Sequence, residues 1–260
     1  MPKITAVVIT RNEAEKIEKC IESLKWCNQV IVIDDFSQDD TVKIAQSRGA
    51  EVFQRDLNKD FSAQRNFGLE KAKNDWVFFA DADEIVTPPL AKNIVRRVKK
   101  TGYSGFYIPR KELFAGKPLN CTDKPSWDWS FGPIKLIRLG KKGSGKWKGR
   151  VHETWQIKGK VGKIGKPLYH HSFENITEAL KKINFYTSIK ANQDFDTGRK
   201  TSIKEIVFYP GAKLFKNFFW HLGFLDGTTG LVFCLLMSLQ SFLSKAKLWL
   251  LQKKAAKEDR

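Results

Sequence analysis

The first hundred residues alternate between short apolar runs and amphipathic segments. The apolar runs are rich in β-branched and aromatic residues, which predicts strands buried on both faces. These runs are TAVVIT (5–10), QVIVIDD (29–35), EVFQ (51–54) and WVFFADADE (76–84). Segments with helical spacing of apolar residues follow each run, at 12–26, 39–50, 61–74 and 88–100. Strands that alternate with helices predict an α/β fold with a mostly parallel central sheet.

The pattern changes after Gly102, where shorter strands are joined by glycine- and lysine-rich loops. Strands are predicted at GFYIPRKEL (105–113), IKLIRLGK (134–141) and PLYHHSF (167–173). ITEALKKINFYTSIKANQDF (176–195) then predicts a helix, and the chain from Phe208 onward is aromatic and apolar with interspersed glycines. The sequence therefore predicts an α/β domain followed by a helical C-terminal region.

The fourth predicted strand ends in the carboxylates Asp81, Asp83 and Glu84. Carboxylates are rarely buried unless they are paired or bind a metal. In open α/β sheets, ligands bind at the carboxyl ends of the strands. Asp81 and Asp83 are therefore candidates for a metal or ligand site. The alternative is a solvated loop that happens to be acidic.

Polar residues also follow the other predicted strands, and so many polar residues would seldom share this position by chance. They are Thr10, Asn12 and Glu13 after the first strand and Asp34, Asp35 and Ser37 after the second, while Arg65 and Asn66 lie on the helix before the fourth. Neither G-x-G-x-x-G nor a P-loop occurs, which makes nicotinamide and Walker-type nucleotide sites improbable. A nucleotide would instead be held by side chains, since a carboxylate can accept the imide N–H of uracil and an arginine can meet a base or a phosphate.

The chain is strongly basic, with a net charge of +18 and a pI near 9.7. This charge favours anionic partners: nucleotides, nucleic acid or an anionic membrane surface. The lysine-rich stretch KKGSGKWKGR (141–150) has neither a recognised nucleic-acid motif nor a run of stacking aromatics, so we expect no nucleic-acid partner. The four cysteines form no C-x-x-C pair and are expected to be reduced thiols in the cytoplasm.

Four segments together resemble the nucleotide-sugar-binding half of family 2 inverting glycosyltransferases of the GT-A fold. They are AVVITRNEAEKIEKCIESL (6–24), VIVIDDFSQDDT (30–41), SAQRNFGLEKA (62–72) and WVFFADADE (76–84), in the family's order. GRVHETW (149–155) and FLDGTTG (224–230) further resemble the branch that contains bacterial lipopolysaccharide-core glucosyltransferases. The resemblance implies that a hexose, glucose in the first instance, moves from a UDP-sugar to a membrane-borne saccharide acceptor such as the lipopolysaccharide inner core. It also implies inversion at the anomeric carbon.

The resemblance also implies roles for the residues at the strand ends. Asp35 would contact the uracil, Thr10 and Glu13 would line the nucleoside pocket beside Asn12, and Arg65 would help to hold the nucleotide. Asp81 and Asp83 would form the D-x-D motif. Of these two, Asp83 would be the direct ligand of a Mg²⁺ or Mn²⁺ ion that bridges the two phosphates, and Asp81 would support the ion and the nucleotide.

An inverting transferase needs a carboxylate that deprotonates the acceptor hydroxyl. Glu153, in KWKGRVHETW, is the first candidate, and Asp128, in SWDWSFG, is the second. His152 stands where the family often has another acid, and it is a candidate metal ligand, acceptor contact or packed imidazole. His170 and His171 are taken as structural.

The resemblance divides the chain into a catalytic domain over 1–173 and a helical region over 174–260. Residues 1–100 would be the nucleotide-sugar-binding half, and 101–173 the acceptor half. The apolar stretch GLVFCLLMSLQSFL (230–243) is shorter than the ~20 residues of a membrane span, and Ser238, Gln240 and Ser241 interrupt it.

The segments around this stretch mix lysines with aromatic residues, which favours peripheral contact with an anionic membrane, here its cytoplasmic face. The side chains expected to enter the membrane are Phe218, Phe219, Trp220, Leu248 and Trp249. The alternative is a helical hairpin that packs on the domain or on a second subunit.

Two other functions compete with the transferase. One is a basic membrane- or nucleic-acid-binding protein that carries an inactive GT-A-like domain. The other is a nucleotidyltransferase, which usually has a glycine-rich loop after its first strand, and this chain has none. Metal-dependent UDP binding would separate the transferase from an inactive domain.

Overall fold

The structure is a computed structural model of the 260-residue chain. It describes residues 2–58, 60–99, 102–120, 136–149, 153–173 and 175–258. These residues form two compact units. The first comprises the described residues of Met1–Lys111 and Phe131–His170, and the second those of Glu112–Ser130 and His171–Arg260. The functional division into a catalytic domain over 1–173 and a helical region over 174–260 stays a prediction.

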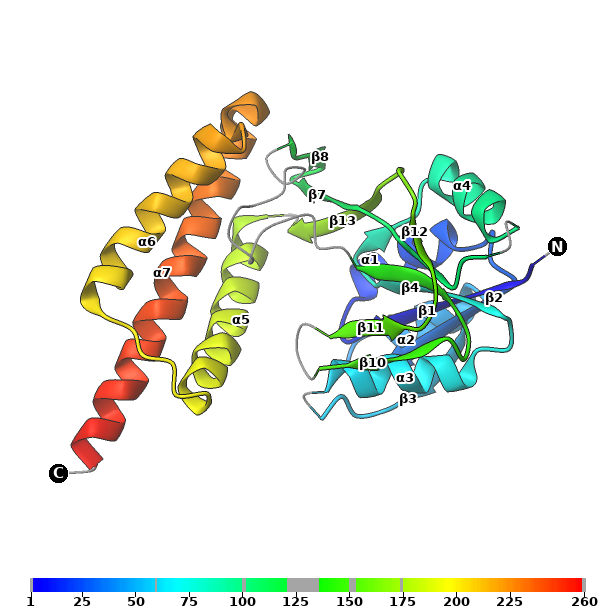
Figure 1. Ribbon diagram of the computed structural model, residues 1–260, viewed down its shortest axis with the longest axis horizontal. Coiled ribbons are helices and arrows are strands. Elements are labelled where there is room, and N and C mark those ends of the chain that lie inside the picture. The colour runs from blue at the N-terminus through cyan, green and yellow to red at the C-terminus, as the bar shows by residue number, and fades with distance from the viewer. Residues whose placement is uncertain are drawn as a thin grey trace. The chain divides into compact units, whose positions relative to one another are not determined.

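A seven-stranded sheet in the order β12-β6-β9-β4-β1-β2-β3 organises the first unit (Figure 1). Its strands are β1 (Ile4–Thr10), β2 (Gln29–Asp34), β3 (Glu51–Gln54), β4 (Trp76–Asp81), β6 (Gly105–Tyr107), β9 (Ile137–Lys141) and β12 (Val161–Lys163). β1 runs parallel to β2 and β4, and β2 runs parallel to β3, whereas β9 is antiparallel to both β4 and β6. The mostly parallel α/β sheet expected from the sequence is confirmed.

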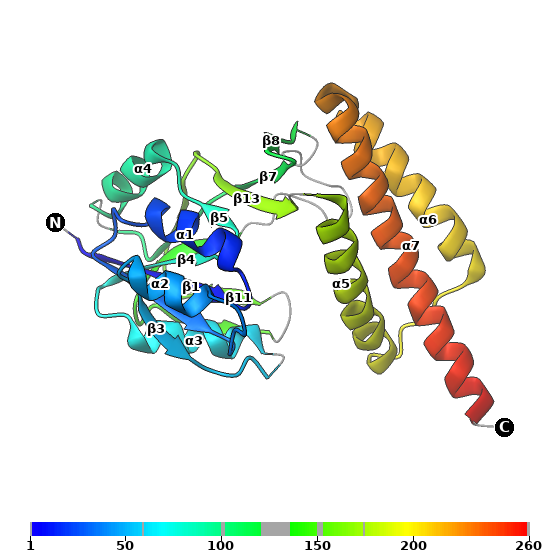
Figure 2. The same cartoon turned by 180° about the vertical axis from the view of Figure 1, so that it is seen from behind.

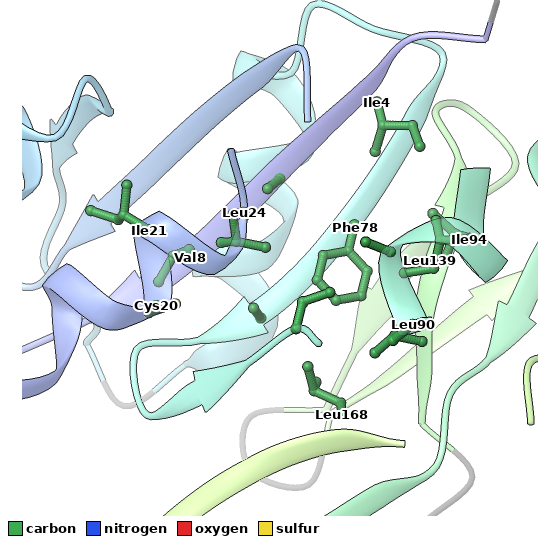
Figure 3. Close-up of a cluster of buried hydrophobic side chains, with 14 of the residues drawn as sticks. Ile4, Val8, Cys20, Ile21, Leu24, Phe78, Leu90, Ile94, Leu139 and Leu168 are labelled. Atoms are coloured by element: carbon green, nitrogen blue, oxygen red, sulfur yellow. The ribbon is translucent and has the colours of Figure 1, made fainter. Parts of the chain in front are cut away.

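Helices cover one face of this sheet, and a helix with a β-hairpin covers the other (Figure 2). The helices of the unit are α1 (Ala14–Ser23), α2 (Thr41–Ser47), α3 (Phe61–Lys71) and α4 (Pro88–Val98), and the hairpin is formed by β10 (Gly145–Lys148) and β11 (Thr154–Ile157). α1, α2 and α4 share one apolar core, where Phe78 of β4 meets Leu24, the residue after α1, and Leu90 of α4 (Figure 3). The opposite core contains Phe79, Trp147 and Trp155.

The segment predicted as one strand at 105–113 is two strands in the structure. β6 ends at Tyr107 and pairs with β9, whereas β7 (Arg110–Phe114) pairs at Leu113 and Phe114 with β8 (Lys117–Pro118). Pro109 stands between them and has no N–H to donate to a sheet ladder, which explains why the strand breaks there. Two further short strands, β5 (Glu84–Ile85) and β13 (Leu168–Phe173), pair antiparallel and place His170 opposite Glu84.

The second unit is mainly helical. It contains α5 (Ile176–Asp196), α6 (Ile203–Phe215), a π-helix (Lys216–Trp220), a 3-10 helix (Gly223–Asp226) and α7 (Gly227–Glu258). α7 packs against both α5 and α6 and lies between them in both views (Figures 1 and 2). Asn175 caps α5 as expected from the sequence, since its side chain accepts a hydrogen bond from the Glu178 amide.

Two expectations about the C-terminal region differ from the structure. Among the described residues, one helical stretch, Gly223–Lys257, is long and apolar enough to cross a membrane, judged by length and composition alone. α7 continues through Ser238, Gln240 and Ser241, and the Ser238 hydroxyl donates a 2.7 Å hydrogen bond to the Pro210 carbonyl of α6. Leu248, expected to enter a membrane, is buried to 1% exposure within the structure, so its side chain is unavailable for insertion.

Candidate active site

The polar strand ends predicted from the sequence meet at one edge of the sheet. Because β1, β2 and β4 are parallel neighbours, their carboxyl ends lie side by side: Thr10 is in register with Asp34, and Ile9 with Asp81. Open α/β sheets bind their ligands at this edge. The structure therefore brings the candidate residues that follow all three strands to one region of the first unit.

Asp35 is held in a fixed orientation at the end of β2. Its carboxylate is nearly buried, at 4% exposure of the residue. The Leu57 amide donates to Oδ1 at 2.9 Å, and Arg11 Nη1 donates to Oδ2 at 2.8 Å. Each carboxylate oxygen has a second acceptor site, so Asp35 can still accept from a ligand. Its neighbour Asp34 has a different role, because it is fully buried and accepts hydrogen bonds from Ser37, which shape the loop.

At the end of β1, Thr10 has a hydroxyl without a hydrogen-bond partner among the described residues, and the next residues, Asn12 and Glu13, form hydrogen bonds that hold the loop. The buried Thr10 hydroxyl has no hydrogen-bond partner among the described residues, which fits a surface that receives a ligand. Asn12 has a left-handed backbone (φ 52°), and its Oδ1 accepts from the Gln38 amide at 2.8 Å. The Glu13 amide donates to Thr41 Oγ1 at 2.9 Å. Asn12 and Glu13 thus tie the loop after β1 to the chain after β2.

Asp81 is engaged on both oxygens by arginines. Arg65 Nη2 lies 2.9 Å from Oδ1, and Arg138 Nη2 lies 2.8 Å from Oδ2. Burial opposes ionisation of this carboxyl, but Arg138 and Arg65 outweigh it and hold the pKa of Asp81 well below its usual value. Asp81 is therefore anionic and committed to ion pairs within the protein.

Arg138 is a buried member of the site that sequence reasoning missed. It projects from β9, is 2% exposed, and joins Asp81 to the fully buried Glu84, whose Oε1 lies 2.8 Å from Arg138 Nη2. Burial alone would lower the pKa of Arg138, but the two carboxylates outweigh it and raise that pKa above its usual value. Burial raises the pKa of the Glu84 carboxyl, which is also near Asp81. An arginine between Ile137 and Leu139 in a buried strand was the available signal, because a buried cation requires a buried anion.

Asp83 differs from Asp81 in its neighbours. Its Oδ1 lies 3.3 Å from His170 Nε2, and both side chains are partly buried. His170, taken as structural from the sequence, is placed here because β13 pairs with β5 and sets His170 opposite Glu84. The sequence offered no signal for this contact, which joins residues from distant parts of the chain.

The side chains at Asp83 offer better ligand atoms for a divalent cation than those at Asp81. No group of three or more His, Cys, Asp or Glu side chains that could hold a metal occurs within the part of the chain that the structure describes. A cation bound mainly by substrate phosphates needs only one or two protein ligands, and carboxylate oxygen and imidazole nitrogen suit Mn²⁺. Asp83 and His170 supply that pair, whereas both Asp81 oxygens face arginines.

Glu153 lies beside this edge through its ion pair with Arg65. Arg65 Nε and Glu153 Oε1 are 2.7 Å apart, and the two side chains are 7% and 12% exposed. One guanidinium therefore joins the first candidate base to Asp81. Its third nitrogen, Nη1, is buried and has no partner among the described residues. The predicted role of Arg65 in holding the nucleotide would have to use that nitrogen.

Aromatic packing fixes Arg65 and the hairpin that leads to Glu153. The Arg65 guanidinium lies 4.8 Å from the Trp147 ring centroid and 5.7 Å from that of Phe79. Asn66 exchanges two hydrogen bonds with the backbone of Trp147, at 2.9 and 3.0 Å. Trp147 stacks on Trp155 across the hairpin. Gly68 allows α3 to approach β1, since a Cβ there would lie 2.4 Å from Val7 Cγ1.

The second candidate base, Asp128, and His152 lie outside the described residues. The structure therefore compares Glu153 with neither of them. The choice of Glu153 as the base stays a prediction, as do the other predicted site roles.

A family model described as "Glycosyl transferase family 2" matches residues 5–147, more than half of the chain. The chain belongs to glycosyl transferase family 2. A glycosyltransferase of Rickettsia felis is 30% identical over 95% of this chain and 90% of its own length. The lipopolysaccharide core biosynthesis glycosyltransferase LpsC of Rhizobium meliloti is 28% identical over 96% of this chain and 93% of its own.

The fold agrees with this family membership. Residues 1–349 of S. aureus TarS superpose with a TM-score of 0.51 at 14% identity, covering 97% of this chain and 92% of that one. The parallel-rich mixed sheet with its helices is the GT-A fold expected from the sequence. The family 2 matched region, 5–147, includes β1, β2, β4 and β9, which position the strand-end residues, and α3, which positions Arg65.

Proposed function

We propose that this family 2 glycosyltransferase moves a hexose, glucose in the first instance, from a UDP-sugar to a saccharide acceptor at the cytoplasmic face of an anionic membrane, with inversion at the anomeric carbon. The observation that carries the proposal is the Glu153–Arg65–Asp81 arrangement, which holds a carboxylate suited to be a base next to the D-x-D strand end. The similarity to LpsC supports an acceptor of the lipopolysaccharide-core type.

The donor would bind across the carboxyl ends of β1, β2 and β4. Asp35 would accept the imide N–H of uracil, and its contacts with Arg11 and Leu57 hold it ready to do so. The unsatisfied Thr10 hydroxyl would face the nucleoside. Asp83, with His170 beside it, would hold Mg²⁺ or Mn²⁺. The chemistry that a bound divalent cation supplies is neutralisation of the charge that develops on the departing UDP.

In the transfer, the acceptor hydroxyl oxygen forms a bond to the anomeric carbon while the bond from that carbon to the UDP oxygen breaks. The hydroxyl proton passes to Glu153, and UDP leaves with the bonding electron pair. Glu153 Oε1 is occupied by Arg65, so Oε2 is the oxygen that would take the proton. Arg65 keeps the carboxylate oriented while proton transfer proceeds at the other oxygen.

The test is UDP release from a panel of UDP-hexoses, with Mn²⁺ and with a chelator. We expect slow hydrolysis of one or two donors that requires the cation, because water can replace an unknown acceptor. The sugar released first should have the anomeric configuration opposite to that of the donor, as NMR can follow. Release without any cation would overturn the metal assignment, and retention would overturn the single-displacement mechanism.

A further inference from the structure

One side of α6 is apolar and exposed to solvent. α6 has an apolar sequence, yet none of its residues is buried. The exposed apolar side chains of α6 and of the π-helix that follows are Ile203, Val207, Phe208, Tyr209, Phe215, Phe219 and Trp220. The Phe215 and Phe219 ring centroids are 5.0 Å apart, so the exposed surface continues from one helix into the next. We name Val207, Phe208, Phe215, Phe219 and Trp220 the α6 face.

Contacts with α7 fix which side of α6 is exposed. The Ser238 hydroxyl of α7 donates to the Pro210 carbonyl, and Lys245 of α7 pairs with Glu205. Leu214 packs against the core of the second unit. The α6 face is on the part of the helix that these contacts leave uncovered, where Phe208 is 71% and Phe215 is 63% exposed. A contiguous apolar surface of this kind marks an interaction site.

The segment from Arg199 to Trp220 carries five basic residues and one acidic residue, and Arg199 at its start lies 3.8 Å from Asp194. The basic residues on and beside α6 and the π-helix are Arg199, Lys200, Lys204, Lys213 and Lys216. Glu205 is the acidic residue of this segment, and its hydrogen bond to Lys245 lowers its pKa and commits its charge. A helix with an apolar face and flanking cations binds the interface of an anionic bilayer, because apolar burial and charge attraction act together.

We propose that the α6 face docks this enzyme on an anionic lipid bilayer, with α6 lying in the plane of the membrane interface. The inference rests on the proposed function in one respect: a lipid-borne acceptor is the reason why the enzyme would need the membrane. A second copy of the chain is a poorer occupant, since a two-fold contact through this face would bring like cations together. α7 packs against α5 and α6 but keeps exposed apolar side chains of its own, Leu231, Leu235, Phe242 and Leu250; we assign the docking to the α6 face.

The test measures co-sedimentation of the full chain with vesicles of phosphatidylcholine alone and with added phosphatidylglycerol. The docking variant is Phe208→Asp with Phe215→Asp, and the matched control is Phe185→Asp, which changes an equally exposed aromatic (61%) on α5. We expect wild type and the control to bind anionic vesicles, and the docking variant to lose about tenfold or more in affinity. The double variant Lys200→Gln with Lys204→Gln should bind anionic vesicles more weakly and leave binding to neutral vesicles unchanged.

Four outcomes decide the proposal. Equal binding of the docking variant and wild type would overturn it, and so would wild type that ignores anionic vesicles and forms a dimer that the docking variant cannot form. Bound protein that resists alkaline carbonate would show a spanning helix and overturn in-plane docking. Because Phe208 and Phe215 belong to the second unit and the strand-end residues to the first, UDP-sugar hydrolysis in solution should be unchanged in the docking variant. Vesicle binding without any hydrolysis would support this inference and overturn only the proposed function.

Discussion

Arg65 and Glu153 form a 2.7 Å ion pair although 88 residues separate them in the chain. The same guanidinium contacts Asp81 at 2.9 Å. A single buried arginine therefore couples the strand end of the D-x-D motif to the candidate base, and the distance between these two carboxylates is set by one planar group. Arginine suits this position because its fork can serve two carboxylates at once.

Replacing Arg65 with Lys should therefore impair both ends of this link. A lysine ammonium is a point charge and cannot reproduce the two-sided contact. We expect kcat for UDP-sugar hydrolysis to fall about tenfold or more, because Glu153 loses its fixed orientation. The control is Arg48→Lys, whose exposed pair with Glu18 should change stability by less than about 0.5 kcal/mol. Wild-type kcat in Arg65→Lys would show that the pair does not position the base.

Changing Asp81 to Asn and changing Asp83 to Asn should impair different properties: the free energy of unfolding in the first case, and the effect of Mn²⁺ on UDP affinity in the second. Asp83→Asn should remove the increase in UDP affinity that Mn²⁺ causes. Asp81→Asn should lower the free energy of unfolding by about 1.5–3 kcal/mol, because two arginines each lose a charged hydrogen-bond partner. Calorimetry of UDP binding with and without Mn²⁺, together with urea unfolding, separates the two. A loss of the metal effect in Asp81→Asn alone would reverse the assignment.

His170 should affect the choice of cation. Imidazole nitrogen suits Mn²⁺ better than Mg²⁺, which prefers oxygen ligands. In His170→Gln we expect UDP affinity to fall more in Mn²⁺ than in Mg²⁺. His171→Gln is the matched control, since successive side chains of a strand point to opposite faces. Equal responses of the two variants, or of the two cations, would leave His170 as a structural partner of Asp83.

The buried Arg138 should show non-additive energetics with Glu84. Arg138→Met leaves Glu84 and Asp81 without their shared cation, and we expect it to cost about 3–5 kcal/mol of stability. Glu84→Gln added to Arg138→Met should recover part of that loss, because one uncompensated buried charge is removed. Urea unfolding of the two single variants and the double variant gives the coupling energy. A double variant as unstable as the sum of the singles would show that the ion pair is not coupled.

The sequence predicts the strand-end residues but not the residues, distant in the same chain, that contact them. Thr10, Asp35 and Asp81 were found because each follows a run whose composition marks a buried strand, and parallel strands end together. Arg138 and His170 were missed because their positions depend on β9 pairing antiparallel with β4 and on β13 pairing with β5. Such pairings join distant segments, and no local pattern specifies them. Leu248 was misjudged for a similar reason, since the packing of α5 and α6 on α7 decides which side chains of α7 are buried.

The most direct test of the account is a comparison of Glu153→Gln with wild type in two separate measurements. Gln keeps the size of the side chain but cannot accept the acceptor proton. We predict that kcat for UDP-sugar turnover falls roughly 10²-fold or more, while the Kd for UDP in Mn²⁺ stays unchanged, because Glu153 serves the acceptor side. Turnover within a fewfold of wild type would contradict the assignment of Glu153 as the base. If Asp128→Asn then gave the large loss, the base would be Asp128.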